Sequence, residues 1–127
     1  MKPQKFSITA RLQSFKYAFD GFKEFIKTEH NARLHLFFTL LVILSGFYFG
    51  LNKTEWIIIV FAIAIVFITE ILNTSIEKIA DFICTTENSK IKKIKDLAAL
   101  AVLISALMAI VIGLIIFLPK ILQQFNF

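Results

Sequence analysis

Long apolar runs separated by short polar segments dominate the chain. Three of them stand out, at residues 34–51, 56–83 and 97–118. A helix needs roughly 20 apolar residues to cross the hydrocarbon core of a bilayer, which is about 30 Å thick. The pattern therefore predicts three transmembrane helices with these bounds, the first a little short and the second unusually long.

A different pattern precedes the first run. Between residues 8 and 29, apolar residues recur every three or four positions, with charged residues between them: Leu12, Phe15, Phe19, Phe22 and Ile26. This spacing gathers the apolar side chains on one face of a helix. A helix packed on a soluble core would show the same pattern, but the sequence offers no such core. We therefore expect an amphipathic helix on the membrane surface.

The composition agrees with an all-α integral membrane protein. Hydrophobic residues make up 57% of the chain, and the mean hydropathy is +0.76. Soluble domains are only about 45–50% apolar. Internal repeats and low-complexity linkers are absent from the sequence. We therefore expect a single domain over residues 1–127.

Lysine and arginine are distributed unevenly. Of the 14 basic residues, seven lie in residues 1–33 and five between residues 78 and 95, whereas Lys53 and Lys120 lie apart from both groups. The positive-inside rule then predicts that the amino terminus and the 84–96 segment are cytoplasmic and the carboxyl terminus is outside. Basic residues beside a membrane meet anionic lipid head groups. The net charge of +5 is thus explained without a nucleic-acid partner.

The second run ends in a stripe of oxygen-bearing side chains. Residues 56–69 carry no charge, and Glu70, Asn73, Glu77 and Asp81 follow. On a helix these four fall within an arc of roughly 80°. Charged groups at membrane depth are costly and mark functional sites. The stripe suits a cation with its phosphate ligand, although polar contacts between helices would produce the same pattern.

A phosphoryl-transfer site in this chain has to be built from carboxylates, a metal ion and lysines, because the glycines form neither a P-loop nor a kinase glycine-rich loop. Such catalysis is mostly positioning and charge neutralisation. Glu70, in an apolar setting, is the candidate general base, and Asn73 is placed to orient it. Glu77 and Glu29 are candidate Mg²⁺ ligands. Lys95 is a candidate point charge for a nucleotide phosphate.

A non-enzymatic membrane protein, such as an ion conduit or a regulatory subunit, is the competing interpretation. A conduit needs a continuous polar path across the membrane. Residues 56–67, the outer half of the second run, contain no polar side chain that extends such a path. Because the polar side chains are confined to one half of the run, the pattern favours a binding or catalytic site over a pore.

At these residues the chain resembles the small prokaryotic lipid kinases of the diacylglycerol kinase and undecaprenol kinase family. The resemblance rests on residues 70–77 with Asp81, on Lys95-Asp96, on residues 15–21, and on Glu29 with Asn31 and Arg33. Residues 70–77 are similar to the signature helix of the family. The similarity extends from about residue 11 to residue 120.

The resemblance implies an ATP- and Mg²⁺-dependent lipid kinase of the bacterial cytoplasmic membrane. It implies a homotrimeric helical bundle whose active sites are shared between neighbouring subunits. Glu70 would be the base supported by Asn73, and Glu29 and Glu77 would hold the metal ion. The implied nucleotide contacts are Tyr17, Glu29, Glu77, Thr86, Glu87, Asn88, Lys95 and Asp96. Of these, Thr86, Glu87 and Asn88 match the family by position and not by residue type.

The expected lipid follows from finer details of the resemblance. Arg33-Leu34-His35 resembles the undecaprenol kinase branch, so undecaprenol is the expected substrate. Diacylglycerol, converted to phosphatidic acid in phospholipid metabolism, is the alternative. Ala10 stands where diacylglycerol-type members often carry arginine, and Leu100 stands in a run that the family usually keeps small. We expect His35 to bond a backbone carbonyl or a lipid head group, or otherwise to shape the lipid pocket.

Overall fold

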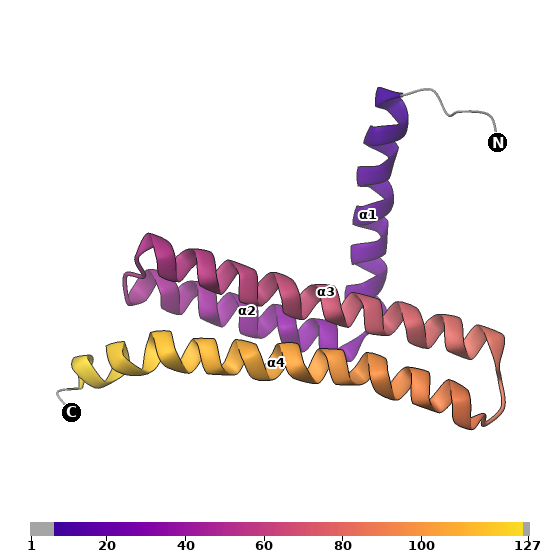
Figure 1. The fold of residues 1–127 in the computed structure, drawn as a ribbon. Coiled ribbons are helices and arrows are strands. Elements are labelled where there is room, and N and C mark those ends of the chain that lie inside the picture. The colour runs from indigo at the N-terminus through magenta and orange to yellow at the C-terminus, as the bar shows by residue number, and fades with distance from the viewer. Residues whose placement is uncertain (1–6, 126–127) are drawn as a thin grey trace.

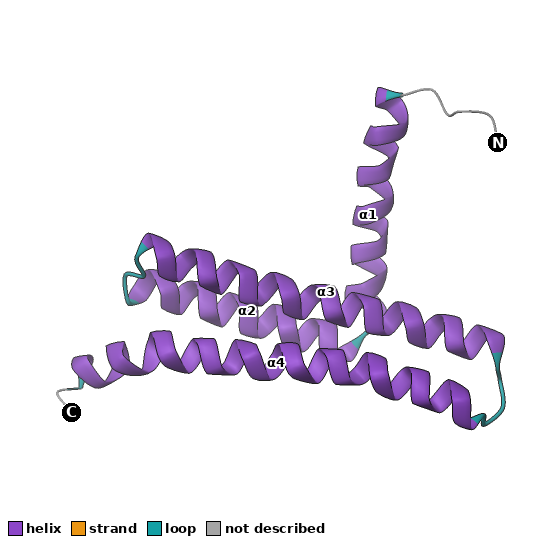
Figure 2. Cartoon of the chain, viewed as in Figure 1, coloured by secondary structure: helices purple, strands orange, loops and turns teal. Residues whose placement is uncertain are grey.

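A computed structural model describes residues 7–125 of the chain as four α-helices joined by short loops (Figures 1 and 2). The helices are α1 (Ile8–Thr28), α2 (His30–Tyr48), α3 (Lys53–Ile83) and α4 (Ser89–Gln124). Helices α2, α3 and α4 lie along one another, and α1 leaves this bundle at a steep angle where α2 begins (Figure 1). Each of the three bundle helices is long and apolar enough to cross a membrane. The all-α membrane fold is thereby confirmed.

The helix bounds differ from the apolar runs, and side-chain caps mark the starts of α3 and α4. Helix α4 begins at Ser89, eight residues before the expected start at residue 97, because the Asn88 side chain accepts hydrogen bonds from the backbone N–H groups of Lys90 and Ile91. Lys95 and Asp96 therefore lie within a helix instead of at its entry. Helix α2 likewise starts at His30 and ends at Tyr48, three residues before the expected end at 51.

A tight turn joins α2 to α3 and fixes their pairing. Gly50 takes a positive φ of 64°, which glycine adopts without the steric cost that a side chain would bring. The N–H of Gly50 donates to the carbonyl of Phe47, and the N–H of Leu51 donates to that of Gly46. This is the Schellman pattern of a helix end. Leu51 then packs with Ile59 of α3 and Ile116 of α4, so the turn anchors the core at this end of the bundle.

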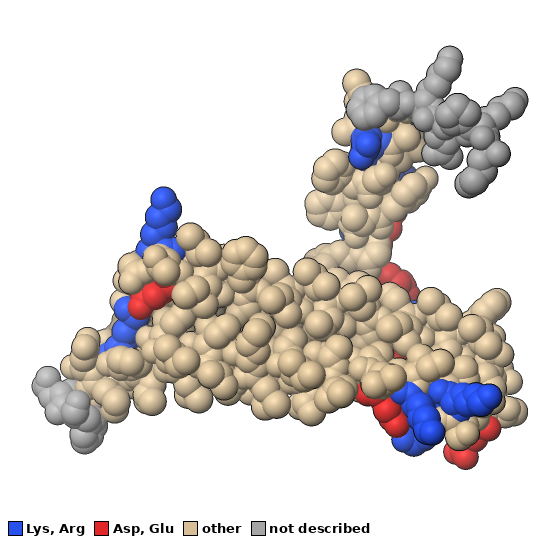
Figure 3. Space-filling model, in the orientation of Figure 1, with Lys and Arg blue, Asp and Glu red and all other residues tan. Residues whose placement is uncertain are grey.

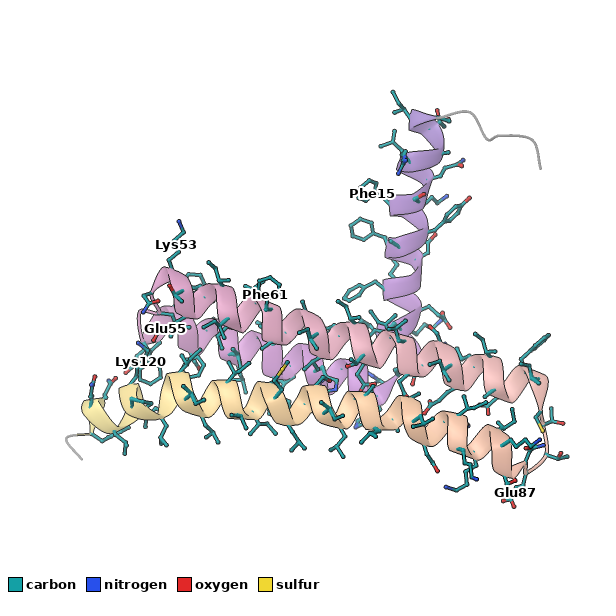
Figure 4. The ribbon with its side chains drawn as sticks, viewed as in Figure 1. Phe15, Lys53, Glu55, Phe61, Glu87 and Lys120 are labelled. Carbon is teal, nitrogen blue, oxygen red and sulfur yellow. The ribbon has the colours of Figure 1, made fainter. Side chains whose placement is uncertain are left out.

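Charge marks the level of the membrane. On the face shown in Figure 3, charged side chains gather at the two ends of the bundle and along α1, with an uncharged belt between them. In Figure 4, Lys53, Glu55 and Lys120 lie at one end, Glu87 lies at the other, and Phe15 projects from α1 toward the Lys53 end. The apolar face of α1 thus faces the uncharged belt, as a helix in the membrane interface requires. Helices α3 and α4 continue past α1 on the Glu87 side (Figure 1).

Gly46 allows the close approach of α2 and α3. A β-carbon at this position would lie 2.6 Å from the nearest atom of the Trp56 ring, which itself packs on Phe47 with ring centroids 4.9 Å apart. We predict that Gly46→Ala pushes the Trp56 ring off Phe47 and costs about 1–3 kcal/mol of stability, as overpacking does. Thermal unfolding in detergent should therefore move to a lower midpoint.

Gly113→Ala is the matched control, since nothing lies within 4 Å of the position of its β-carbon. Its midpoint should stay unchanged or rise slightly, because alanine is the better helix former. Equal losses in the two variants would contradict the proposed role of the contact between Gly46 and Trp56.

Candidate active site

Glu70 is the centre of the candidate site. Glu70 is only 3% exposed and directly follows the uncharged residues 56–69 of α3. Its carboxylate oxygen Oε1 lies 2.9 Å from Nε2 of His35, which belongs to α2. The His35 ring also meets Phe67 edge-on, with ring centroids 6.4 Å apart.

A hydroxyl pair joins α3 to α4 beside Glu70. The Thr69 and Ser105 hydroxyl oxygens lie 2.7 Å apart, and Ser105 is buried. Since residues 69 and 70 point about 100° apart on a helix, one can face α4 while the other faces α2. Polar contacts of this kind fix the rotation of helices in a membrane bundle. They hold Glu70 toward His35.

Asn73 and Glu77 follow on the same stretch of α3 and contact each other. The Asn73 amide Nδ2 donates to Glu77 Oε1 over 3.2 Å. The other polar atom of this amide, Oδ1, is buried and has no hydrogen-bond partner among the described residues. Buried acceptors of this kind are rare in proteins and call for an explanation such as a missing ligand. Asn73 also lines a groove of about 390 Å³ between α3 and α4.

Glu29 occupies the link between α1 and α2, where its extended backbone ends one helix and precedes the next. Its carboxylate lies 3.9 Å from the ammonium of Lys78. Lys78 directly follows Glu77, so the two predicted metal ligands lie at the same level of α3. Within residues 7–125 of one chain, however, no group of three or more His, Cys, Asp or Glu side chains converges as a metal site would.

A cleft of about 740 Å³ opens where the loop between α3 and α4 meets both helices. Five of the expected nucleotide contacts line it: Thr86, Glu87, Asn88, Lys95 and Asp96. Two ion pairs lie at its rim, Lys95 to Asp81 at 2.9 Å and Lys92 to Asp96 at 2.7 Å. The cleft thus combines lysine ammonium groups with a polar loop, which is chemistry suited to a phosphate-bearing ligand.

Tyr17 is not brought to this cleft within one chain. It lies on α1, is 65% exposed, and precedes the end of that helix by 11 residues, about 16 Å at 1.5 Å per residue. Because α1 leaves the bundle at its junction with α2 (Figure 1), Tyr17 is not among the residues that line the cleft of its own subunit.

Three side chains of the site were not assigned these roles from the sequence. The bond from His35 to Glu70 was missed, since an ionisable residue in the first span suggested only a lipid or backbone contact. Asp81 was seen as part of the polar stripe, but its pairing with Lys95 was not foreseen. Lys92 is one of several lysines in a row, and the sequence holds no signal that separates it from its neighbours.

Two features define the candidate site of this membrane-spanning helical protein. One is a carboxylate, Glu70, buried among apolar side chains. The other is the charged cleft at the loop between α3 and α4. Comparison with known proteins supports this class. Residues 16–117 match the prokaryotic diacylglycerol kinase family. The chain therefore belongs to that family and is a lipid kinase, which excludes the interpretation as a non-enzymatic conduit or regulatory subunit.

The similar proteins include an undecaprenol kinase and two diacylglycerol kinases. Undecaprenol kinase of Bacillus subtilis is 40% identical over 85% of this chain and 88% of its own length. Diacylglycerol kinase of Synechocystis is 33% identical over 88% of this chain and 65% of its own length. Diacylglycerol kinase of Haemophilus influenzae is 30% identical over 87% of this chain and 94% of its own length. The kinase family implies the use of ATP.

Proposed function

We propose that the protein is an undecaprenol kinase, which transfers the γ-phosphate of ATP to the hydroxyl of undecaprenol at the cytoplasmic leaflet. The burial of Glu70 carries the proposal. A carboxylate at this depth can meet the end of a lipid from the bilayer, while ATP enters through the cleft lined by Thr86, Glu87 and Lys95. The nucleotide would extend from that cleft along α3, past Glu77, toward Glu70.

The chemical step needs one proton acceptor and positively charged groups that hold the phosphates. The hydroxyl O–H bond of the lipid breaks, and its proton passes to the Glu70 carboxylate. The alcohol oxygen forms a bond to the γ-phosphorus, and the bond from that phosphorus to the bridging oxygen breaks, so that ADP leaves with the electron pair. Since there is little covalent work for the protein to do, positioning and neutralisation of charge supply most of the catalysis.

The donor set of α3 and the α1–α2 link fits a magnesium ion. Mg²⁺ in phosphoryl-transfer sites takes one or two carboxylates and fills its other positions with water and phosphate oxygens. Glu77 and Glu29 would be those carboxylates, and the unpartnered Oδ1 of Asn73 is a further oxygen beside Glu77. When bound, the ion would neutralise negative charge on the β- and γ-phosphates.

The proposal includes a homotrimer with shared sites. In one chain Tyr17 does not line the cleft that contains Glu87, and the carboxylates of Glu29 and Glu77 do not form a complete metal site. A neighbouring subunit whose α1 reaches this cleft would bring a tyrosine to it and complete the metal site. The excess of lysine and arginine at the amino terminus and near the Glu87 loop supports an orientation with the cleft in the cytoplasm.

Two observations favour undecaprenol over diacylglycerol. The 40% identity to an undecaprenol kinase exceeds the 33% and 30% identities to the diacylglycerol kinases. The groove beside Asn73 is lined by apolar side chains apart from Asn73 and Thr69, and the Thr69 hydroxyl is already bonded to Ser105. Such a groove suits an isoprenoid chain, whereas the ester carbonyls of diacylglycerol would find few donors there.

Glu70→Gln tests the base. The amide keeps the size of the side chain but cannot accept the proton, so kcat should fall by about 10²-fold or more while the KM for ATP changes little. Steady-state kinase assays in lipid-detergent micelles measure both constants. The control is Glu55→Gln at the far end of the same helix, which should retain the parent kcat. A Glu70→Gln enzyme with parent turnover would remove Glu70 from the mechanism.

Lys95→Met tests the nucleotide cleft. Losing an ammonium beside the triphosphate should raise the KM for ATP about tenfold, equivalent to about 1.4 kcal/mol, with kcat reduced much less. Lys93→Met is the matched control, because Lys93 is on the same helix but does not line the cleft. Equal KM values for the two variants would show that Lys95 does not contact ATP.

A competition assay tests the lipid. Purified protein, labelled ATP and Mg²⁺ would be supplied with equimolar undecaprenol and diacylglycerol in mixed micelles. We expect undecaprenyl phosphate as the main product. Phosphatidic acid as the main product would overturn the undecaprenol assignment and leave the lipid kinase class untouched.

A further inference from the structure

His35 is the ionisable residue that lies deepest in the apolar run of α2, and the proposed reaction has so far given it no part. Its neighbour across the helix interface is the Glu70 carboxylate, at 2.9 Å from its Nε2. The His35 side chain is 23% exposed and that of Glu70 is 5% exposed, so the bond is largely shielded from solvent. A hydrogen bond to a charged carboxylate in such a place is stronger than one at a surface.

The direction of the bond follows from chemistry. A general base has to be deprotonated before it acts, and a carboxylate in that form only accepts hydrogen bonds, so if Glu70 is the base, Nε2 of His35 carries the hydrogen and donates it to Oε1. No other hydrogen bond to the Glu70 carboxylate is found among the described residues of the chain. With Oε1 committed to the imidazole, Oε2 is the oxygen left to take a proton from a lipid hydroxyl.

The imidazole is itself held in place. Phe67 lies one turn before Glu70 on α3 and meets the His35 ring at 65°. The ring is therefore fixed by two residues on the same face of α3, one through its edge and one through its nitrogen. A group that is locked in this way can fix the rotamer of Glu70, which otherwise has several free torsions in an apolar setting.

We propose that His35 is a positioning residue of the kinase reaction: its Nε2–H holds Glu70 Oε1 and thereby aims Oε2 at the hydroxyl of the lipid. The inference rests on the proposed role of Glu70 as the general base. His35 gains and loses no proton in the step. It acts by keeping the base in one orientation, and displacement of a reacting group by about 1 Å is enough to cost roughly 10²-fold in rate.

Two amide substitutions of His35 test whether the hydrogen-bond donor has to reach Oε1 of Glu70. Gln places its N–H₂ near the position of Nε2, whereas Asn, one methylene shorter, does not reach Oε1. His35→Asn should lower kcat by about 10- to 100-fold with an unchanged KM for ATP, and His35→Gln should recover kcat to within about fivefold of the parent. His30→Asn and His30→Gln are the matched controls, because His30 is exposed and points about 140° away on the same helix. Both should keep the parent kcat.

The Asn and Gln variants are compared only after detergent chromatography shows that they assemble like the parent. Equal kcat values for His35→Asn and His35→Gln, whether both high or both low, would overturn the inference, because then the reach of the donor does not matter. A preparation in which His35→Asn does not assemble leaves His35→Gln and His35→Leu to be compared in the same way, with the same two outcomes.

A double-mutant cycle separates this inference from the proposed function. If His35 acts through Glu70, His35→Asn should lower the residual kcat of Glu70→Gln by less than twofold, since the oriented group no longer accepts a proton. Additive losses would overturn the positioning role and leave Glu70 as the base. Parent turnover in Glu70→Gln would instead sink the proposed base, and with it the role given to His35.

Discussion

A carboxylate held among apolar side chains is the constraint on which the arrangement of this protein depends. An ionisable side chain such as Glu70 is costly at membrane depth unless it has a polar partner. His35 is that partner, and the pairing requires α2 and α3 to meet at one depth and one rotation. The hydroxyl pair of Thr69 and Ser105 sets the rotation of α3 from the opposite side. Three helices are therefore tied together at the level of a single reactive group.

The depth of the pairing is set by the links between helices. The turn at Gly50 fixes α2 against α3 at one end of the bundle. At the other end of α2, Glu29 is the one residue between α1 and α2, and its ion pair with Lys78 joins the level of the surface helix to α3. Since α3 and α4 continue beyond this level, the cleft that Glu87 lines lies at a charged end of the bundle (Figures 3 and 4), while Glu70 follows the uncharged residues 56–69 of α3. The separation of a polar nucleotide from an apolar lipid, which the proposed reaction needs, follows from these lengths.

The sequence predicts what depends on local pattern. The three spans and the amphipathic helix were found because hydropathy and helical periodicity are properties of neighbouring residues. Helix α4 starts at Ser89, eight residues before the predicted span, because one capping side chain, Asn88, extends the helix into a charged segment. The contacts of His35 with Glu70 and of Lys95 with Asp81 join residues 35 and 14 positions apart. They depend on how the helices are rotated and aligned, which no pattern within one helix specifies.

Two features of the single chain indicate that the candidate site is incomplete. Asn73 keeps a buried oxygen without a partner, beside the carboxylate of Glu77. Tyr17 does not line the cleft of its own subunit, since α1 leaves the bundle at a steep angle. Both features are explained if, in the proposed trimer, a second copy of α1 completes the cleft and a bound Mg²⁺ meets the Asn73 oxygen. The contact between Glu70 and His35, by contrast, is complete within one subunit. If Glu70 is the base and the trimer shares its sites, as proposed, orientation of the base is a property of the fold, whereas nucleotide binding depends on assembly.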